Sequence, residues 1–128
     1  MATSLLAIVV DCHNPLAQAN YWAAALDHRV SERNTNEYGV SDPSTAGTPL
    51  YFMSVPEAKT VKNRLHVDIT TDRPLEDEVA QLVSAGGTLV EMRQDPATLD
   101  NADTWAVMQD PEGNEFCVLN ADTVTGMA

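Results

Sequence analysis

The same pattern of a strand followed by a helix occurs twice in this chain, and this repeat constrains the fold most tightly. A short apolar run at residues 5–10 is followed by Asn14-Pro15, a good start for a helix, and by an apolar helical stripe over residues 15–26. An alternating stretch at residues 65–70 precedes a second amphipathic helix over residues 74–85. The copies lie 57 to 59 residues apart, so two similar halves fill the chain.

Each predicted helix is followed by three strand-like segments. In the first half they are residues 28–33, 36–41 and 49–55, and in the second half residues 88–93, 104–109 and 115–120. The turn from Asp110 to Asn114 joins the last two, and its aspartate and glycine suit a tight turn. Each half is therefore predicted to be strand–helix–strand–strand–strand.

The length and the charge of the chain exclude several classes of protein. A chain of 128 residues, 44% of them hydrophobic, is typical of one globular domain. No apolar run is long enough to span a membrane and no secretory signal is evident, so we expect a cytoplasmic protein.

A net charge of −12 argues against partners that are nucleic acid or anionic membrane. Residues 65–128 hold thirteen acids and two bases, a net charge of −11. This excess indicates either a solvated surface or an acidic cleft for a cationic ligand.

Three segments, in order, resemble the vicinal oxygen chelate superfamily, which includes glyoxalase I, extradiol dioxygenases and bleomycin-resistance proteins. Residues 11–15 (DCHNP) with 21–26 (YWAAAL) are similar to its first strand and helix. Residues 62–68 (KNRLHVD) are similar to the strand that opens its second half, and residues 110–119 (DPEGNEFCVL) to its final hairpin. The combination is most similar to the small glyoxalase-like branch common in actinobacteria.

The resemblance implies an α+β fold in a single domain spanning residues 1–128. Two tandem βαβββ units, residues 1–58 and 59–128, would form a cupped mixed β-sheet around a cavity, with the helices on the outside. It also implies a homodimer, because the metal-free resistance proteins of the superfamily are usually dimeric.

The superfamily's enzymes bind a divalent metal through His, Gln or Glu on the first and last strands of each unit. The matching positions here are Ala7, residues 50–55, His66 and Cys117, of which residues 50–55 offer no good ligand for a hard metal ion. We therefore expect no metal and no other cofactor, although a two-ligand site of His66 and Cys117 stays open. Cys12 and Cys117 are expected to be reduced thiols, with a disulfide between them as the alternative.

If the strands keep the superfamily's register, alternate residues line one cavity. His66 either bonds to a neighbour such as Asp68 or contacts the ligand, and Trp105 either lines the cavity or closes its end. The predicted ligand-binding residues are Ala7, Val9, Tyr51, Met53, His66, Asp68, Trp105 and Cys117.

Two functions remain open at this level. The first is a metal-free protein that binds a small organic ligand, for example one that sequesters an antibiotic or an aromatic natural product. The second is a lyase or isomerase that acts on a small oxygenated metabolite, with His66 as general base and Asp68 orienting it. We favour the first, because no group for stabilising an enolate is evident in the sequence.

Overall fold

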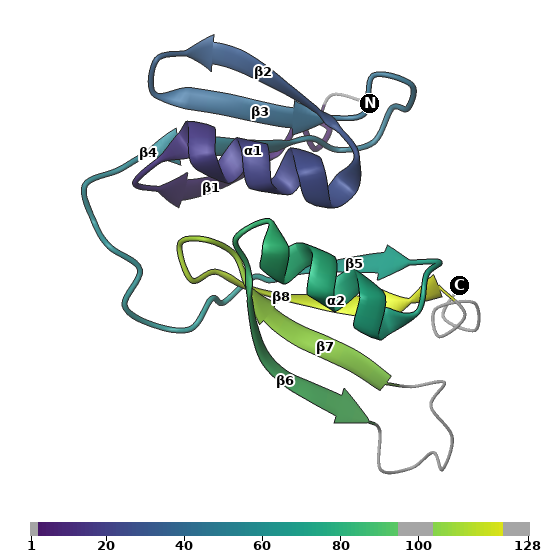
Figure 1. Ribbon diagram of the computed structural model, residues 1–128. Helices are drawn as coiled ribbons and strands as arrows, with labels where there is room; N and C mark the ends of the chain where they lie inside the picture. Colours follow the sequence, from purple (N-terminus) through teal and green to yellow (C-terminus); the bar gives the residue numbers. More distant parts are fainter. Residues whose placement is uncertain (1–2, 95–103, 122–128) are drawn as a thin grey trace. The chain divides into compact units, whose positions relative to one another are not determined.

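The computed structural model describes residues 3–94 and 104–121, and the chain divides into two compact units at Thr60 and Val61 (Figure 1). The first unit consists of β1 (Ile8–Cys12), α1 (Pro15–Leu26), β2 (Arg29–Asn34), β3 (Glu37–Ser41) and β4 (Leu50–Ser54). The second consists of β5 (Val67–Thr71), α2 (Leu75–Ser84), β6 (Thr88–Gln94), β7 (Thr104–Gln109) and β8 (Glu115–Asn120).

Both units have the same sheet topology, which confirms the predicted tandem βαβββ fold. The strand orders are β1-β4-β3-β2 in the first sheet and β5-β8-β7-β6 in the second. In each sheet the first strand pairs in parallel with the last, and the remaining pairs are antiparallel. The helix provides the long connection that a parallel pair requires.

Helix α1 begins and ends where its sequence predicts. The side chain of Asn14 accepts a hydrogen bond from the backbone N–H of Ala17 at 3.1 Å, and Pro15 follows it in the first turn. The helix ends at Asp27, whose φ of 54° is left-handed, a conformation that aspartate tolerates better than most residues. The backbone N–H of His28 bonds back to the carbonyl of Ala23.

Helix α2 is stabilised in a different way at its start. Pro74 provides no side-chain cap, but Glu76, Asp77 and Glu78 place negative charge in the first turn, where the helix dipole favours it. After Ser84 the backbone N–H of Gly87 bonds to the carbonyl of Leu82, and Gly86 has a φ of 126°. The two glycines therefore end the helix.

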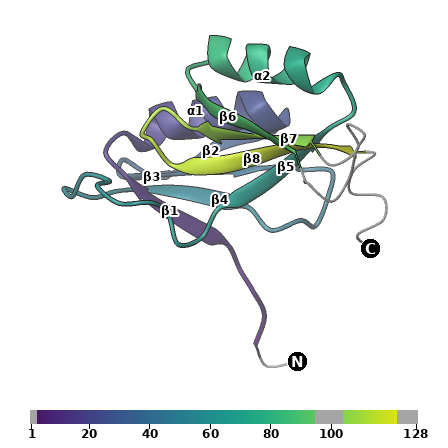
Figure 2. The same cartoon turned by 90° about the horizontal axis from the view of Figure 1, so that it is seen from below.

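Each helix covers one face of its own sheet (Figure 2). In the first unit Val40, Leu50 and Phe52 are buried, as are Ala19 and Trp22 of α1. In the second unit the buried residues are Ile69, Val79, Leu82, Ala106, Met108, Phe116 and Val118. Because strand residues alternate between faces, the residues between them lie on the opposite face of each sheet, here called the helix-free face.

Four residues of the predicted apolar run and helices are exposed rather than buried. The first strand begins at Ile8, whose backbone N–H bonds to the carbonyl of Pro49, and its partner strand β4 offers no pairing before Leu50. Leu5 and Leu6 therefore precede the strand and are exposed. Leu16 and Val83 are also largely exposed, because the buried stripe of each helix is narrower than the apolar pattern.

No helix among the described residues is long and apolar enough to cross a membrane.

Candidate functional site

The helix-free face of the second sheet carries most of the chemically active side chains. Strand register places Asp68 beside Cys117, Cys117 beside Val107 and Val107 beside Glu91. The neighbouring row of the same face runs from Thr70 through Leu119 and Trp105 to Arg93. Residues from all four strands of this sheet therefore meet on one surface.

His66, Asp68 and Cys117 form a close cluster on this face. His66 lies immediately before β5, and its Nδ1 is 3.3 Å from Oδ1 of Asp68, which confirms the predicted partner of the histidine. Donor atoms of the three side chains all lie within 4.8 Å of one another. The side chains of His66 and Asp68 are about half exposed, and Cys117 is half-buried. The cluster therefore offers nitrogen, oxygen and sulfur atoms to an approaching ligand.

The environment of Cys117 raises the pKa of its thiol. Burial of the thiol is the main reason that its pKa is raised, and the charge of Asp68 and its hydrogen bond to the thiol raise the pKa further. Arg93 and Lys62 act in the opposite direction but are smaller influences. A thiol with a raised pKa is a poor nucleophile, so the cysteine is suited to contact a ligand rather than to attack one.

Glu115 is held in a structural role. Alternation places it on the face of β8 that also carries Cys117, and its Oε2 accepts a hydrogen bond from the backbone N–H of Asn63 at 3.0 Å. The carboxylate therefore anchors the segment before β5 against β8. Glu115 and Asn63 are far apart in the chain, so the sequence alone does not reveal this contact.

The remaining predicted residue of the second unit is Trp105. Trp105 is half-buried on the helix-free face, diagonal to Cys117, with Leu119 and Arg93 as its register partners. Arg93 is itself paired with Glu91, with 2.6 Å between Nε and Oε1. The ring is therefore available as a flat apolar surface beside the His66–Asp68–Cys117 cluster.

The other four predicted residues belong to the first unit. Val9 and Tyr51 are register partners, Met53 pairs with Asp11, and Ala7 lies just before β1. The ring of Tyr51 packs against Gly39, where an added Cβ would come within 2.7 Å of it, and Arg33 lies 5.6 Å from its centre. Val9, Tyr51 and Met53 share one face of their sheet, as predicted from the alternation.

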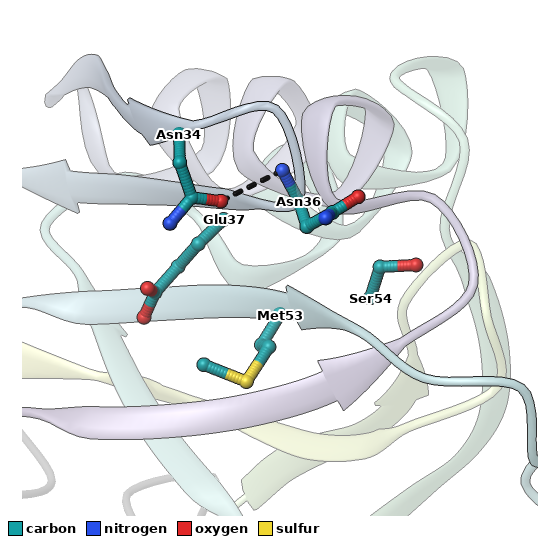
Figure 3. A pocket seen from close by; sticks show the side chains of 5 residues that line it. All are labelled: Asn34, Asn36, Glu37, Met53 and Ser54. Atoms are coloured by element: carbon teal, nitrogen blue, oxygen red, sulfur yellow. Dashed lines mark hydrogen bonds between the residues drawn. The ribbon is translucent and has the colours of Figure 1, made fainter.

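A pocket of about 480 Å³ lies in the first unit where β2 turns into β3. It is lined by Asn34, Asn36, Glu37, Met53 and Ser54 (Figure 3). Of these residues only Met53 was predicted from the sequence. The sequence pattern places Glu37 in a strand but does not predict its burial, which depends on neighbours that the pattern cannot identify.

The superfamily's set of hard metal ligands does not fit this chain. Ala7 has no donor atom, and β4 presents Tyr51 and Met53 on its helix-free face. The one group of three His, Cys, Asp or Glu donors among the described residues is His66, Asp68 and Cys117, all in the second unit. Its mixed nitrogen, oxygen and sulfur donors differ from the oxygen-rich set that hard divalent ions prefer.

Comparisons with known proteins agree with this fold. The family model of the glyoxalase-like domain matches residues 7–119. A glyoxalase/bleomycin resistance/dioxygenase family enzyme from Burkholderia phytofirmans is 19% identical, with a TM-score of 0.71 over 92% of this chain and 98% of that chain. No curated protein matches the chain.

Two further solved structures are similar in fold. A glyoxalase-related enzyme from Fulvimarina pelagi is 16% identical, with a TM-score of 0.67 over 91% of this chain and 87% of that chain. A mutant of the fosfomycin resistance protein FosX from Listeria monocytogenes, solved with Mn(II) and a dihydroxypropylphosphonic acid, is 9% identical. Its TM-score is 0.73, and the match covers 100% of both chains.

Proposed function

Because this chain belongs to the glyoxalase-like domain family of the vicinal oxygen chelate superfamily, we propose that it binds a small organic molecule without the superfamily's divalent metal. The observation that carries the proposal is the His66–Asp68–Cys117 cluster beside Trp105 on one sheet face. A few polar groups that converge next to aromatic and apolar side chains are typical of ligand sites.

The chemistry of this face favours a flat or aromatic ligand. Trp105 offers a stacking surface, while Val107 and Leu119 are apolar neighbours on the same face. His66 and Asp68 provide hydrogen bonds at one end of that surface. An antibiotic or an aromatic natural product has this combination of features. A resistance protein among the structures of similar fold makes sequestration of an antibiotic a reasonable specific form of the proposal, by analogy of fold alone.

One contact favours a second function, a lyase or isomerase. If Nδ1 of His66 donates its proton to Asp68, Nε2 carries a free lone pair and can accept a proton from a substrate. The carboxylate would hold the imidazole in that tautomer and orient it. No stabilising group for an enolate is assigned on this face, so this function ranks second.

Binding at this face is tested by replacing the aromatic ring. A screen of natural-product antibiotics and aromatic metabolites by thermal shift identifies ligands, which are then titrated against Trp105→Ala, Trp105→Phe and His66→Ala. We expect Trp105→Ala to weaken binding by about 1–3 kcal/mol, the scale of a buried aromatic contact, while Trp105→Phe retains most of the affinity. A confirmed ligand that binds all folded variants as tightly as wild type would refute the site.

The same variants separate the two functions. A sequestering protein returns its ligand unchanged, so the ligand recovered after long incubation should have the same mass and stereochemistry. An enzyme converts the ligand, and His66→Gln should abolish conversion while leaving binding largely intact. Asp68→Asn should reduce turnover less than His66→Gln if Asp68 only orients the ring.

The proposal includes a homodimer located in the cytoplasm. A dimer would let two copies of so small a chain form a larger binding surface. One chain has a mass of 13.9 kDa. Light scattering at tens of micromolar protein should give twice this mass. A monomeric mass at this concentration would contradict the assembly but would leave the binding site unaffected.

A further inference from the structure

The pocket between the β2–β3 turn and the end of β4 is built around a buried carboxylate. Glu37 is only 5% exposed, at the start of β3, and its register partner is Met53. Asn34, Asn36 and Ser54 provide the remaining polar groups of the pocket (Figure 3). All five lining residues belong to the first unit, and none is part of the His66–Asp68–Cys117 cluster.

The charge of Glu37 is only partly compensated. Its ion pair with Arg33 spans 3.6 Å from Nε to Oε1, and the arginine side chain is 58% exposed. An exposed, long ion pair contributes little, whereas a buried carboxylate needs a close partner to offset its lost hydration. A cation from a ligand would provide that partner at short distance.

The other lining groups suit a ligand with polar substituents. The Oδ1 of Asn34 accepts a hydrogen bond from the backbone N–H of Asn36 at 2.8 Å, so the amide is held in place with its N–H₂ group as a donor. The side chains of Asn36 and Ser54 add donors and acceptors from two other positions of the pocket. A hydroxyl or carbonyl group near the ligand's charge would find partners here.

The field around the pocket also favours a cation. Met53 of β4 lies between two acidic register partners, Asp11 of β1 on one side and Glu37 of β3 on the other. The first unit, residues 1–60, holds six acids and three bases, a net charge of −3. An anionic ligand would meet repulsion from this local charge.

We propose that this pocket is a second binding site, which takes the ammonium group of a small hydroxylated amine, such as an amino alcohol or an amino sugar. The ammonium group pairs with Glu37, and the neighbouring hydroxyls bond to Asn34, Asn36 and Ser54. The site goes beyond the proposed function, because it uses another unit and another kind of ligand.

The test compares charged and neutral probes by ¹H–¹⁵N NMR. Glucosamine should shift the backbone signals of Asn34, Asn36 and Ser54, while N-acetylglucosamine, which lacks the charge, should shift them far less. Glu37→Gln should weaken glucosamine binding about tenfold or more, the effect of losing a charge-assisted hydrogen bond. Glu57→Gln removes the same charge from an exposed position outside the pocket and should leave binding unchanged.

A variant with the opposite expected effect completes the test. Arg33→Gln removes the competing cation from Glu37 and should tighten glucosamine binding. The same spectra report whether each variant is folded, and Asn34→Ala with Ser54→Ala takes the place of Glu37→Gln if that variant unfolds. Equal shifts with the neutral probe, no binding at tens of millimolar glucosamine, or equal affinity in all folded variants would each overturn the proposal, whatever the outcome at Trp105.

Discussion

The pKa of the Cys117 thiol is raised by its partial burial and by the neighbouring carboxylate of Asp68. The thiolate would lose hydration and would stand beside a negative charge. The pKa of Cys117 is higher in the folded than in the unfolded protein. At pH values below its pKa in the unfolded protein, the protonated thiol therefore favours the folded state. This contribution is lost as the pH rises through the folded pKa.

The first prediction concerns the reactivity of this thiol. Alkylation of Cys117 by iodoacetamide should accelerate only at a higher pH than alkylation of a free cysteine, and Asp68→Asn should move the midpoint to lower pH. Cys12 is 3% exposed and should not react in the folded protein. Asp72→Asn removes a charge from an exposed position nearby in sequence and provides the control. A midpoint unchanged by Asp68→Asn would show that the carboxylate does not influence the thiol.

Residues close in sequence were easier to assign than residues brought together by strand pairing. The contact of His66 with Asp68 was predictable, because residues two apart on a strand share a face. The role of Glu115 and the burial of Glu37 were not, because each depends on a partner or a packing arrangement distant in the sequence. All three residues of the cluster were among the predicted site residues, whereas the pocket in the first unit was missed except for Met53.

Among the elements, the β7–β8 turn is fixed by a single aspartate. Asp110 is 4% exposed, and its Oδ1 accepts hydrogen bonds from the backbone N–H groups of Glu112 and Asn114, each at 3.0 Å. The side chain of Asn114 also donates to it, and Gly113 has a φ of 87°, which favours glycine. These contacts confirm that the residues form the turn.

The second prediction is that Asp110→Ala destabilises the protein by about 2–3 kcal/mol, because several donors around it lose their acceptor. Thermal or urea unfolding gives the value. Asp110→Asn keeps one oxygen that can accept the two backbone bonds and should cost less, so the pair of variants separates hydrogen bonding from side-chain size. Asp72→Ala, at an exposed position elsewhere in the second unit, should change stability little. Equal stability of wild type and Asp110→Ala would contradict this role.

Six of the eight strands were located from the sequence as closely as the helices, but the first strand was not. Asn14, Pro15 and the glycines after α2 are local signals, so both helices lie within a residue of their predicted bounds. The first strand starts three residues later than its apolar run, because β4 determines where pairing can begin. A strand's ends depend on its partner, and sequence periodicity does not contain that information.

For the whole molecule, the repeat in the sequence predicted the repeat in the topology. Two strand–helix patterns 57 to 59 residues apart correspond to two units with the same strand order. The charge does not follow the repeat, since the acidic excess is concentrated after residue 64. The fold is therefore duplicated while the chemistry is not, and the cluster and the pocket each occur in one unit.

The last prediction concerns the metal content of the whole chain. The three donors of the His66–Asp68–Cys117 cluster are close enough to hold an ion. However, the thiol must lose a proton, despite its raised pKa, before its sulfur can bind a metal. In the first unit, Ala7 occupies one of the superfamily's metal-ligand positions, and its side chain has no atom that can bind a metal. Elemental analysis of protein purified without chelators should therefore find much less than one Zn, Fe, Mn or Ni per chain. About one equivalent that disappears in His66→Ala, or glyoxalase activity with methylglyoxal and glutathione, would show that the protein keeps a functional metal.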